Sequence, residues 1–208
     1  MIKIQELRKQ DYKKARQFAI QGMHLHWYVS NKIILNLYAR YFLDLELSRA
    51  TKAYGAYVED QFVGILLADM KDEPKKYHSI WRTTYIRFLG WLQRLVAGDG
   101  VEAYDKANQE MLHVFCEKST PGGEIVFFAA DPNSKIRGIG TALLSALEKE
   151  EQGKLVYLYT DNACTYQFYE HRGFTREGEQ QILLDLGKKE VPLTCFLYAR
   201  QLERRNDV

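Results

Sequence analysis

Residues 124–150 read Glu-Ile-Val-Phe-Phe-Ala-Ala-Asp-Pro-Asn-Ser-Lys-Ile-Arg-Gly-Ile-Gly-Thr-Ala-Leu-Leu-Ser-Ala-Leu-Glu-Lys-Glu, and they contain the most informative pattern in the chain. An apolar strand leads into a short basic loop and then, around Gly138 and Gly140, into an amphipathic helix. Glycines let backbone N–H groups approach a phosphate closely, and the N-terminus of the following helix favours negative charge. The stretch therefore predicts a phosphate-binding strand–loop–helix unit, although the same glycines also suit an ordinary helix entry.

The loop fits neither of the common nucleotide-binding motifs. A dinucleotide-binding fingerprint requires a third glycine where Leu143 stands, and a Walker loop requires a lysine between Gly140 and Thr141. The loop instead resembles motif A of the GNAT N-acetyltransferase superfamily, Gln/Arg-x-x-Gly-x-Gly/Ala, which holds the diphosphate of acetyl-CoA. Lys135 occupies the first position here, which departs from the motif but keeps a positive charge.

A second block, residues 162–174, resembles motif B of the same family. In that motif an asparagine lies seven residues before a tyrosine, which is followed by Glu-x-x-Gly-Phe; here these positions run from Asn162 and Tyr169 to Phe174. Thr165 replaces the usual alanine. The resemblance implies an acetyl-CoA-dependent N-acetyltransferase that moves an acetyl group to an amine by direct attack on the thioester. The alternative function is a non-catalytic acyl-CoA-binding regulatory module.

The rest of the chain predicts an α/β fold with a mixed sheet. Strands are expected near 2–6, 53–58, 62–68, 124–130, 155–160, 174–186 and 192–201, and helices over 12–23, 31–45, 137–150 and 163–171. This order resembles the GNAT acyl-CoA N-acyltransferase fold, as a single domain over 1–208. A helical insertion over about 71–120, before the fourth strand, is longer than the usual connection, and it could cover the acceptor site or mediate a homodimer.

Two side chains are candidates for proton transfer. A phenol of pKa ~10 stays protonated near neutral pH and can protonate a departing thiolate of pKa ~8.5; in the family the tyrosine of motif B, here Tyr169, has this role. The base candidate is Glu124, which resembles the general-base glutamate of histone-type members, and strand alternation predicts that it shares a face with Val126, Phe128 and Ala130. Tyr169 could instead be a core residue, and ordered water could replace Glu124 as the base.

The resemblance also implies which residues contact acetyl-CoA. Backbone groups at the end of the strand would polarise the thioester carbonyl, and the loop would surround the diphosphate. The implied residues are Phe128, Ala129, Ala130, Lys135, Ile136, Arg137, Gly138, Ile139, Gly140 and Thr141. Asn162 would reach the pantetheine arm, or it could simply cap its helix.

The acceptor, an amine on a small molecule, peptide or protein, is not identified by the sequence. The aromatic loop over 24–30 could form a cage for an organic cation or could be a packed helix connection. His24 and His26 have no third ligand nearby, so no metal site is expected.

The composition of the chain limits which partners and which cellular compartment are expected. The 208 residues include 29 basic and 27 acidic side chains, and a net charge of +2 argues against a nucleic-acid or membrane partner. The charged N-terminus, three scattered cysteines and the lack of a run of ~18 apolar residues predict a cytoplasmic protein.

Overall fold

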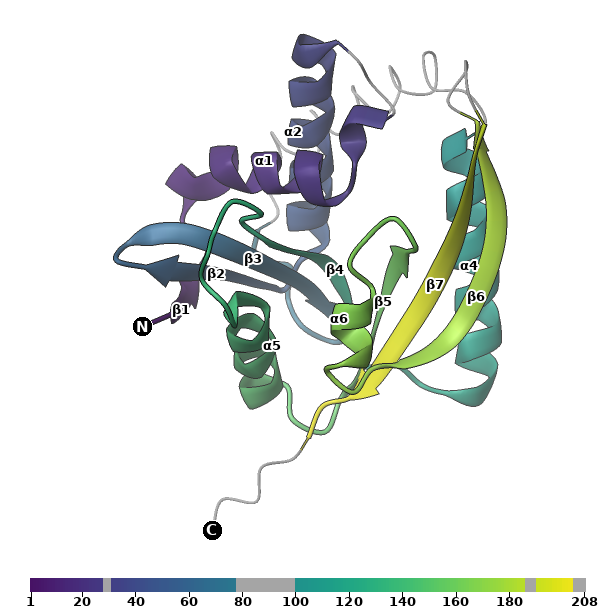
Figure 1. The fold of residues 1–208 in the computed structure, drawn as a ribbon. Helices are drawn as coiled ribbons and strands as arrows, with labels where there is room; N and C mark the ends of the chain where they lie inside the picture. The colour runs from purple at the N-terminus through teal and green to yellow at the C-terminus, as the bar shows by residue number, and fades with distance from the viewer. Residues whose placement is uncertain (28–30, 78–99, 186–189, 204–208) are drawn as a thin grey trace.

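A seven-stranded mixed sheet forms the centre of the fold (Figure 1). The computed structural model describes residues 1–27, 31–77, 100–185 and 190–203. The strands are β1 (Lys3–Glu6), β2 (Lys52–Val58), β3 (Gln61–Met70), β4 (Gly123–Ala130), β5 (Leu155–Asp161), β6 (Thr175–Asp185) and β7 (Glu190–Gln201), in the order β1-β2-β3-β4-β5-β7-β6. Only β4 and β5 are parallel, and the other neighbours are antiparallel. The predicted mixed α/β fold is confirmed.

Helices cover both faces of the sheet (Figure 1). The helices are α1 (Tyr12–Gly22), α2 (Lys32–Arg49), α4 (Gly100–Lys118), α5 (Ile139–Glu150) and α6 (Gln167–Glu170), with 3-10 turns at Lys9–Asp11 and Leu25–Trp27. The apolar stripe of α5 and the aromatic side chains of α6 pack on one face. On the other face, α1 and α2 cover β2 to β4, whereas α4 covers β5, β6 and β7. None of the described helices combines the length and apolarity needed to cross a membrane.

Two helices begin later than the sequence predicts. Gly138 adopts a left-handed conformation (φ 84°), so α5 begins at Ile139 rather than at residue 137. The helix expected over 163–171 is reduced to the single turn of α6. The Asp161 carboxylate accepts hydrogen bonds from the N–H groups of Ala163 and Cys164 (2.9 and 3.1 Å), and this side-chain bonding holds a turn in place of a first helical turn.

A β-bulge in β4 changes which side chains share a face. Leu67 of β3 pairs with Phe127, but the next residue, Ala68, pairs with Ile125, so Val126 is the extra residue. Val126 and Phe127 therefore both pack against the α1–α2 side, and Phe128 packs on the α5 side. The prediction that Glu124 and Phe128 share a face is wrong, because the bulge interrupts the two-residue period of the strand.

The predicted insertion is described only in part. Helix α4 occupies its second half, and residues 78–99 lie outside the described part of the chain. Met111 and Phe115 of α4 are buried in a cluster with Cys195 and Leu197 of β7. This helix therefore packs on the sheet and forms one wall of the face that α2 also covers. The single-domain organisation and the insertion itself stay predictions.

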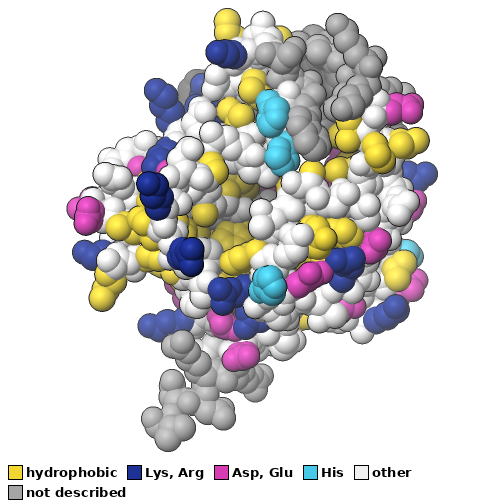
Figure 2. All heavy atoms as spheres, in the orientation of Figure 1, with side chains coloured by type: hydrophobic (Ala, Val, Ile, Leu, Met, Phe, Trp, Pro, Cys, Tyr) yellow, Lys and Arg dark blue, Asp and Glu magenta, His cyan; other side chains and the backbone are white. Residues whose placement is uncertain are grey.

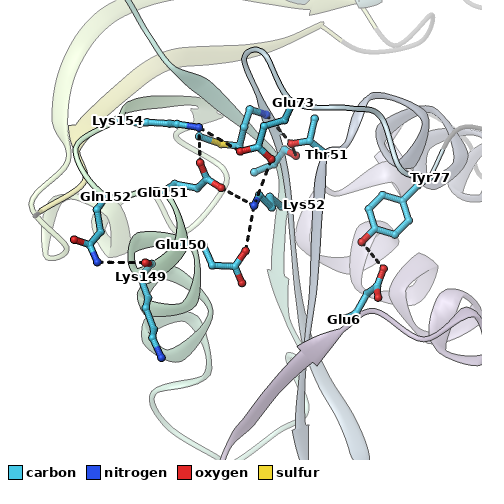
Figure 3. Close-up of polar contacts among 12 residues, drawn as sticks. Glu6, Thr51, Lys52, Glu73, Tyr77, Lys149, Glu150, Glu151, Gln152 and Lys154 are labelled. Carbon is cyan, nitrogen blue, oxygen red and sulfur yellow. Dashed lines mark hydrogen bonds and ion pairs between the residues drawn. The ribbon is translucent and has the colours of Figure 1, made fainter. Parts of the chain in front are cut away.

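Ion pairs fix the C-terminal end of α5 to the sheet (Figure 3). Glu151, which follows α5, is 3% exposed and lies 2.6 Å from the Nζ atoms of both Lys52 and Lys154. Burial opposes ionisation of this carboxyl, but hydrogen bonds from the two lysines lower its pKa overall. Glu73 contacts both lysines as well (3.3 and 3.2 Å). The anchored C-terminus directs the opposite end of α5 toward the open edge of β4.

Candidate functional site

Strands β4 and β5 pair only at their beginnings and then separate. The parallel register joins Gly123 to Val156 and Glu124 to Tyr157. Beyond these residues β4 continues to pair with β3 as far as Ala130, and β5 continues with β7 as far as Asp161. The two strands therefore open a wedge in the middle of the sheet, which we call the β4–β5 wedge.

Backbone N–H groups of β4 point into this wedge. The N–H group of Asp131 donates to the Val63 carbonyl of β3 (2.8 Å). Because bonding direction alternates along a strand, the N–H group of Ala129 also points to β3, whereas those of Phe128 and Ala130 point away from it. Of the three backbone N–H groups predicted to bind the thioester carbonyl, those of Phe128 and Ala130 thus face the wedge, and that of Ala129 faces β3.

The loop before α5 presents backbone donors and cations to solvent. Lys135, Ile136, Arg137 and Gly138 are exposed, and α5 begins without a side-chain cap. The first N–H groups of an uncapped helix lack acceptors within the helix. The predicted diphosphate contacts are therefore gathered at one place, where unpaired donors and positive charge coincide.

Asp131 organises the start of this loop. Its Oδ1 accepts from the N–H group of Asn133 (3.0 Å), and its Oδ2 lies 2.9 Å from the Nζ atom of Lys14 on α1. Burial disfavours the charged carboxyl, but the Lys14 and Asn133 hydrogen bonds lower its pKa overall. Asp131 consequently stays ionised and ties the loop to α1.

Gly140 brings the two sequence motifs into contact. A Cβ at this position would lie 2.8 Å from the Phe168 ring and 3.3 Å from the Phe128 ring, so only glycine allows this approach. The Phe128 and Phe168 ring centroids are 5.5 Å apart. Figure 2 shows a hollow with a hydrophobic floor and with Lys and Arg side chains along its rim. Phe168 was not a predicted site residue, and its only sequence signal is its place one residue before Tyr169.

Tyr169 lies beside the wedge among aromatic rings. Its ring centroid is 6.1 Å from that of Phe128 and 5.7 Å from that of Phe174. Burial, and secondarily the nearby Cys164 thiol, raise the pKa of the Tyr169 phenol. The raised pKa keeps the phenol protonated, and the described residues provide no hydrogen-bond partner for its hydroxyl, which can therefore donate to a group in the wedge.

Glu124 lies on the opposite face of the sheet, where it is held by two side chains. Its Oε2 accepts from Arg49 of α2 (2.5 Å) and from the Tyr157 hydroxyl of β5 (3.2 Å). The other carboxylate oxygen, Oε1, has no hydrogen-bond or ion-pair partner among the described residues. The carboxylate is thus anchored by one oxygen, and the other is available to accept a proton. Arg49 and Tyr157 are distant in sequence from Glu124, so no local pattern indicated them.

Arg49 also contacts a second carboxyl group. Its Nη1 lies 3.4 Å from Oε2 of Glu46, which is 7% exposed. Burial raises the pKa of Glu46 to about 7, against the opposing effect of Arg49 and with a further increase from Glu124 and Asp69. Two carboxyl groups, Glu46 and Glu124, therefore share the single Arg49 guanidinium on this face, and the raised pKa leaves Glu46 partly protonated near neutral pH. Their oxygens are acceptors that suit an ammonium group.

Asn162 does not cap α6. Its N–H group donates to the Thr194 carbonyl and its Oδ1 accepts from the Thr194 N–H group, both at 3.0 Å. The side chain thus extends the pairing of β5 with β7 by one residue. Its predicted contact with a pantetheine arm stays a prediction.

Two further contacts were not predicted from the sequence. The Arg172 guanidinium lies 5.7 Å from the Phe168 ring centroid, which adds a cation on the α6 side. His24 Nε2 lies 3.0 Å from the Ala163 carbonyl oxygen, so the α1–α2 connection reaches the β5–α6 turn. Residues 28–30 of the predicted aromatic cage lie outside the described part of the chain. Within that part, no cluster of three or more metal-binding side chains is present.

One protein-family model matches most of the chain. The model of the acetyltransferase (GNAT) family matches residues 23–174, which include both motifs and the wedge. In a comparison with curated protein sequences, none matches the chain.

Solved structures of acetyltransferases share the fold at low sequence identity. An agmatine N-acetyltransferase matches with a TM-score of 0.59 and 12% identity, over 96% of this chain and 99% of its own. A histone-acetyltransferase-related protein from Corynebacterium glutamicum matches with a TM-score of 0.59 and 15% identity, over 100% of this chain and 99% of its own. The Drosophila melanogaster polyamine N-acetyltransferase, which forms N-acetylagmatine, matches with a TM-score of 0.58 and 13% identity, over 97% of this chain and 100% of its own.

Proposed function

The chain belongs to the GNAT acetyltransferase family, and we propose that it transfers an acetyl group from acetyl-CoA to an amine by direct attack of the amine on the thioester. The observation that carries this proposal is the β4–β5 wedge. One face of the wedge has the loop proposed to bind phosphate and Tyr169, and the other has Glu124, at the closed end where β4 and β5 still pair. A donor for the leaving group and an acceptor for the amine proton would thus lie on opposite faces of the sheet.

The residues around the wedge fit acetyl-CoA. The exposed loop with its left-handed Gly138 would bind the diphosphate, with Lys135 and Arg137 supplying charge. The Phe128 and Phe168 rings would provide an apolar surface for the pantetheine arm. When bound, acetyl-CoA would supply an activated acetyl thioester.

On the α5–α6 face, the protein would stabilise charge and supply a proton. The N–H groups of Phe128 and Ala130 would donate to the thioester oxygen as it becomes negative, a contribution on the order of 3 kcal/mol for one preorganised donor. Tyr169 would give its proton to the departing thiolate, since its raised pKa keeps the phenol protonated throughout the physiological pH range.

On the α2–α4 face, Glu124 would receive a proton from the amine. Its Oε1 would accept the proton directly or through an ordered water, while Oε2 stays bonded to Arg49 and Tyr157. Arg49 would keep its contact with the Glu46 carboxyl group when Glu124 becomes neutral. Ordered water alone remains the alternative base.

The acceptor would be an amine on a small molecule, peptide or protein. It would approach from the α2–α4 face, where carboxyl groups outnumber the Arg49 guanidinium. Agmatine and polyamines, the substrates named for two structural neighbours, are cations of this kind, and they are the first compounds to test.

A thiol-release assay with acetyl-CoA and a panel of amines tests the proposal. We expect release of CoA thiol that depends on both the amine and the protein. Tyr169→Phe should reduce turnover by roughly 100-fold, the scale of general acid catalysis, while calorimetry shows nearly unchanged binding of acetyl-CoA. Binding without thiol release across the panel would instead support the non-catalytic acyl-CoA-binding module.

A further inference from the structure

The single turn of α6 carries the proposed acid but has little internal support. Tyr169 lies in a helix of four residues, which is too short to hold a side chain by its own hydrogen bonds. The backbone helps only locally, because the Tyr169 carbonyl accepts from the N–H groups of Arg172 and Phe174 (2.9 and 3.0 Å). The position of Tyr169 must therefore depend on contacts between α6 and the sheet.

The residue after Tyr169 makes such contacts. Oε1 of Glu170 accepts from Arg176 of β6 (2.8 Å) and from the hydroxyl of Tyr198 of β7 (2.6 Å). Arg176 Nε donates to the same Tyr198 oxygen (3.0 Å). The three side chains form a closed ring of hydrogen bonds that joins α6 to two strands.

We propose that Arg176, Glu170 and Tyr198 form a clamp that positions Tyr169 for proton donation; this inference rests on the proposed function. Charged partners make these hydrogen bonds strong, because a carboxylate accepts from a guanidinium and a phenol at once. The Glu170 pKa is lowered by the bond from Tyr198 and then by that from Arg176, so the carboxylate needed for the clamp is ionised.

Aromatic packing fixes the cation in this clamp. The Arg176 guanidinium lies 4.2 Å from the Phe196 ring centroid and 5.5 Å from that of Tyr198. A planar guanidinium can stack on a ring and donate in its own plane, which a lysine ammonium cannot do. Arg176 is thereby held in one orientation, although much of its side chain is near the surface.

A bulge in β6 orients Arg176 toward α6. A β-bulge lies between Arg176 and Gly178 in β6, so that Arg176 pairs with Tyr198 and Gly178 with Leu197. Arg176 consequently faces α6, and Gly178 faces Met111 of α4, where a Cβ would be 3.0 Å from that side chain. The bulge thus satisfies two different packing requirements on the two faces.

Tyr198 links the clamp directly to the acid. It is completely buried, and its ring centroid lies 6.2 Å from that of Tyr169. Its hydroxyl is occupied as acceptor for Arg176 and donor to Glu170. Tyr198 is therefore a wall for the Tyr169 ring rather than a second proton donor, and the clamp acts on catalysis through Tyr169.

The test compares two partners of the same arginine in the thiol-release assay. Arg176→Gln and Glu170→Gln should each lower kcat by roughly 10-fold or more, since small displacements of a reacting group have effects of this size, with KM for acetyl-CoA changed less than about twofold. Glu179→Gln is the matched control, because Glu179 of β6 accepts from Nη1 of Arg176 (2.8 Å) but is not one of the three side chains that join α6 to the strands; its kcat should stay near wild type. Equal losses in Glu170→Gln and Glu179→Gln would overturn the clamp.

A double-mutant cycle separates positioning from general stability. In the Tyr169→Phe background, Arg176→Gln should have little further effect on kcat, because it acts through the missing hydroxyl. The same loss in both backgrounds would overturn the inference. Arg176→Lys, which keeps the charge but not the planar geometry, should restore kcat partly and serves if Arg176→Gln does not fold. If Tyr169→Phe loses turnover and Arg176→Gln keeps wild-type turnover, the clamp alone is refuted. If Tyr169→Phe keeps full turnover, both the proposed acid and the clamp are refuted.

Discussion

The two faces of the β4–β5 wedge are built in different ways. The α5–α6 face comes from two continuous stretches, 131–141 and 162–174, whose glycines and backbone groups create the site. The α2–α4 face is assembled from side chains that are far apart in sequence, such as Arg49 and Glu124, which are 75 residues apart. Local backbone geometry thus specifies the proposed cofactor side, and tertiary packing specifies the proposed acceptor side.

The two faces also differ in charge. Exposed cations and uncapped N–H groups surround the start of α5, whereas the region around Glu124 holds partly buried carboxyl groups that share Arg49. A diphosphate fits the first setting and an ammonium the second. Substitutions on the α5–α6 face should therefore change acetyl-CoA affinity, and those on the α2–α4 face should change turnover or its pH dependence.

The largest effect on affinity is expected from Gly138→Val. The φ of 84° strains any β-branched residue, and the side chain would occupy the open space where a ligand approaches the backbone. We expect acetyl-CoA affinity to fall by roughly 100-fold, about 2.7 kcal/mol, in calorimetry. Gly138→Ala, which adds strain but little bulk, should lose much less. Normal affinity in the valine variant would exclude this loop as the diphosphate site.

On the other face, Glu124→Gln should reduce turnover without changing acetyl-CoA affinity. Loss of a general base typically costs about 100-fold in kcat/KM. Arg49→Gln is the companion variant, because it retains the carboxylate while removing the guanidinium from Oε2, and it should lose less. Wild-type turnover in Glu124→Gln would assign the proton transfer to ordered water.

A third prediction concerns the pH dependence of stability. The pKa of Glu46 is about 7 in the folded protein, above the ~4.3 of an unfolded glutamate, so the folded state favours the protonated carboxyl. Its stabilising contribution is therefore complete below pH ~4 and is lost as the pH rises to about 7, by on the order of 3 kcal/mol. Urea unfolding from pH 5 to 8 should show a steeper loss of stability in wild type than in Glu46→Gln. Parallel curves would show that Glu46 does not titrate in this range.

The smallest effect is expected from Lys135→Gln. This side chain is exposed, so its interaction with a phosphate is screened by water and salt. Acetyl-CoA affinity should fall roughly three- to fivefold at low ionic strength and less at high salt. Lys106→Gln on α4, whose side chain is 77% exposed, is the matched control and should have no effect. An equal loss in both variants would indicate only a general charge effect.

Much of the fold and of the α5–α6 face could be predicted from sequence, because periodicity and glycine placement act locally. The order of strands and helices along the chain, the amphipathic helix α5 and the glycine-containing loop before it depend on such signals. The family match and the neighbouring structures confirm the mixed α/β fold.

Other features depended on contacts that no local pattern encodes. The bulge at Val126 is imposed by the pairing with Leu67 and Ala68, and it reversed the face of Phe128 relative to Glu124. The shortening of α6 came from the Asp161 carboxylate, which competes for N–H groups that a helix would otherwise use. Arg49, Tyr157 and Arg176 join the site only through tertiary packing.

Residue-resolved amide exchange tests whether the open edge of β4 is the acyl-CoA site. In the free protein, the N–H groups of Phe128 and Ala130 should exchange much faster than that of Ala129, which faces β3. Addition of CoA should slow the exchange at Phe128 and Ala130 and leave Ala129 unchanged. Protection of all three without ligand, or no response to CoA at Phe128 and Ala130, would contradict the account.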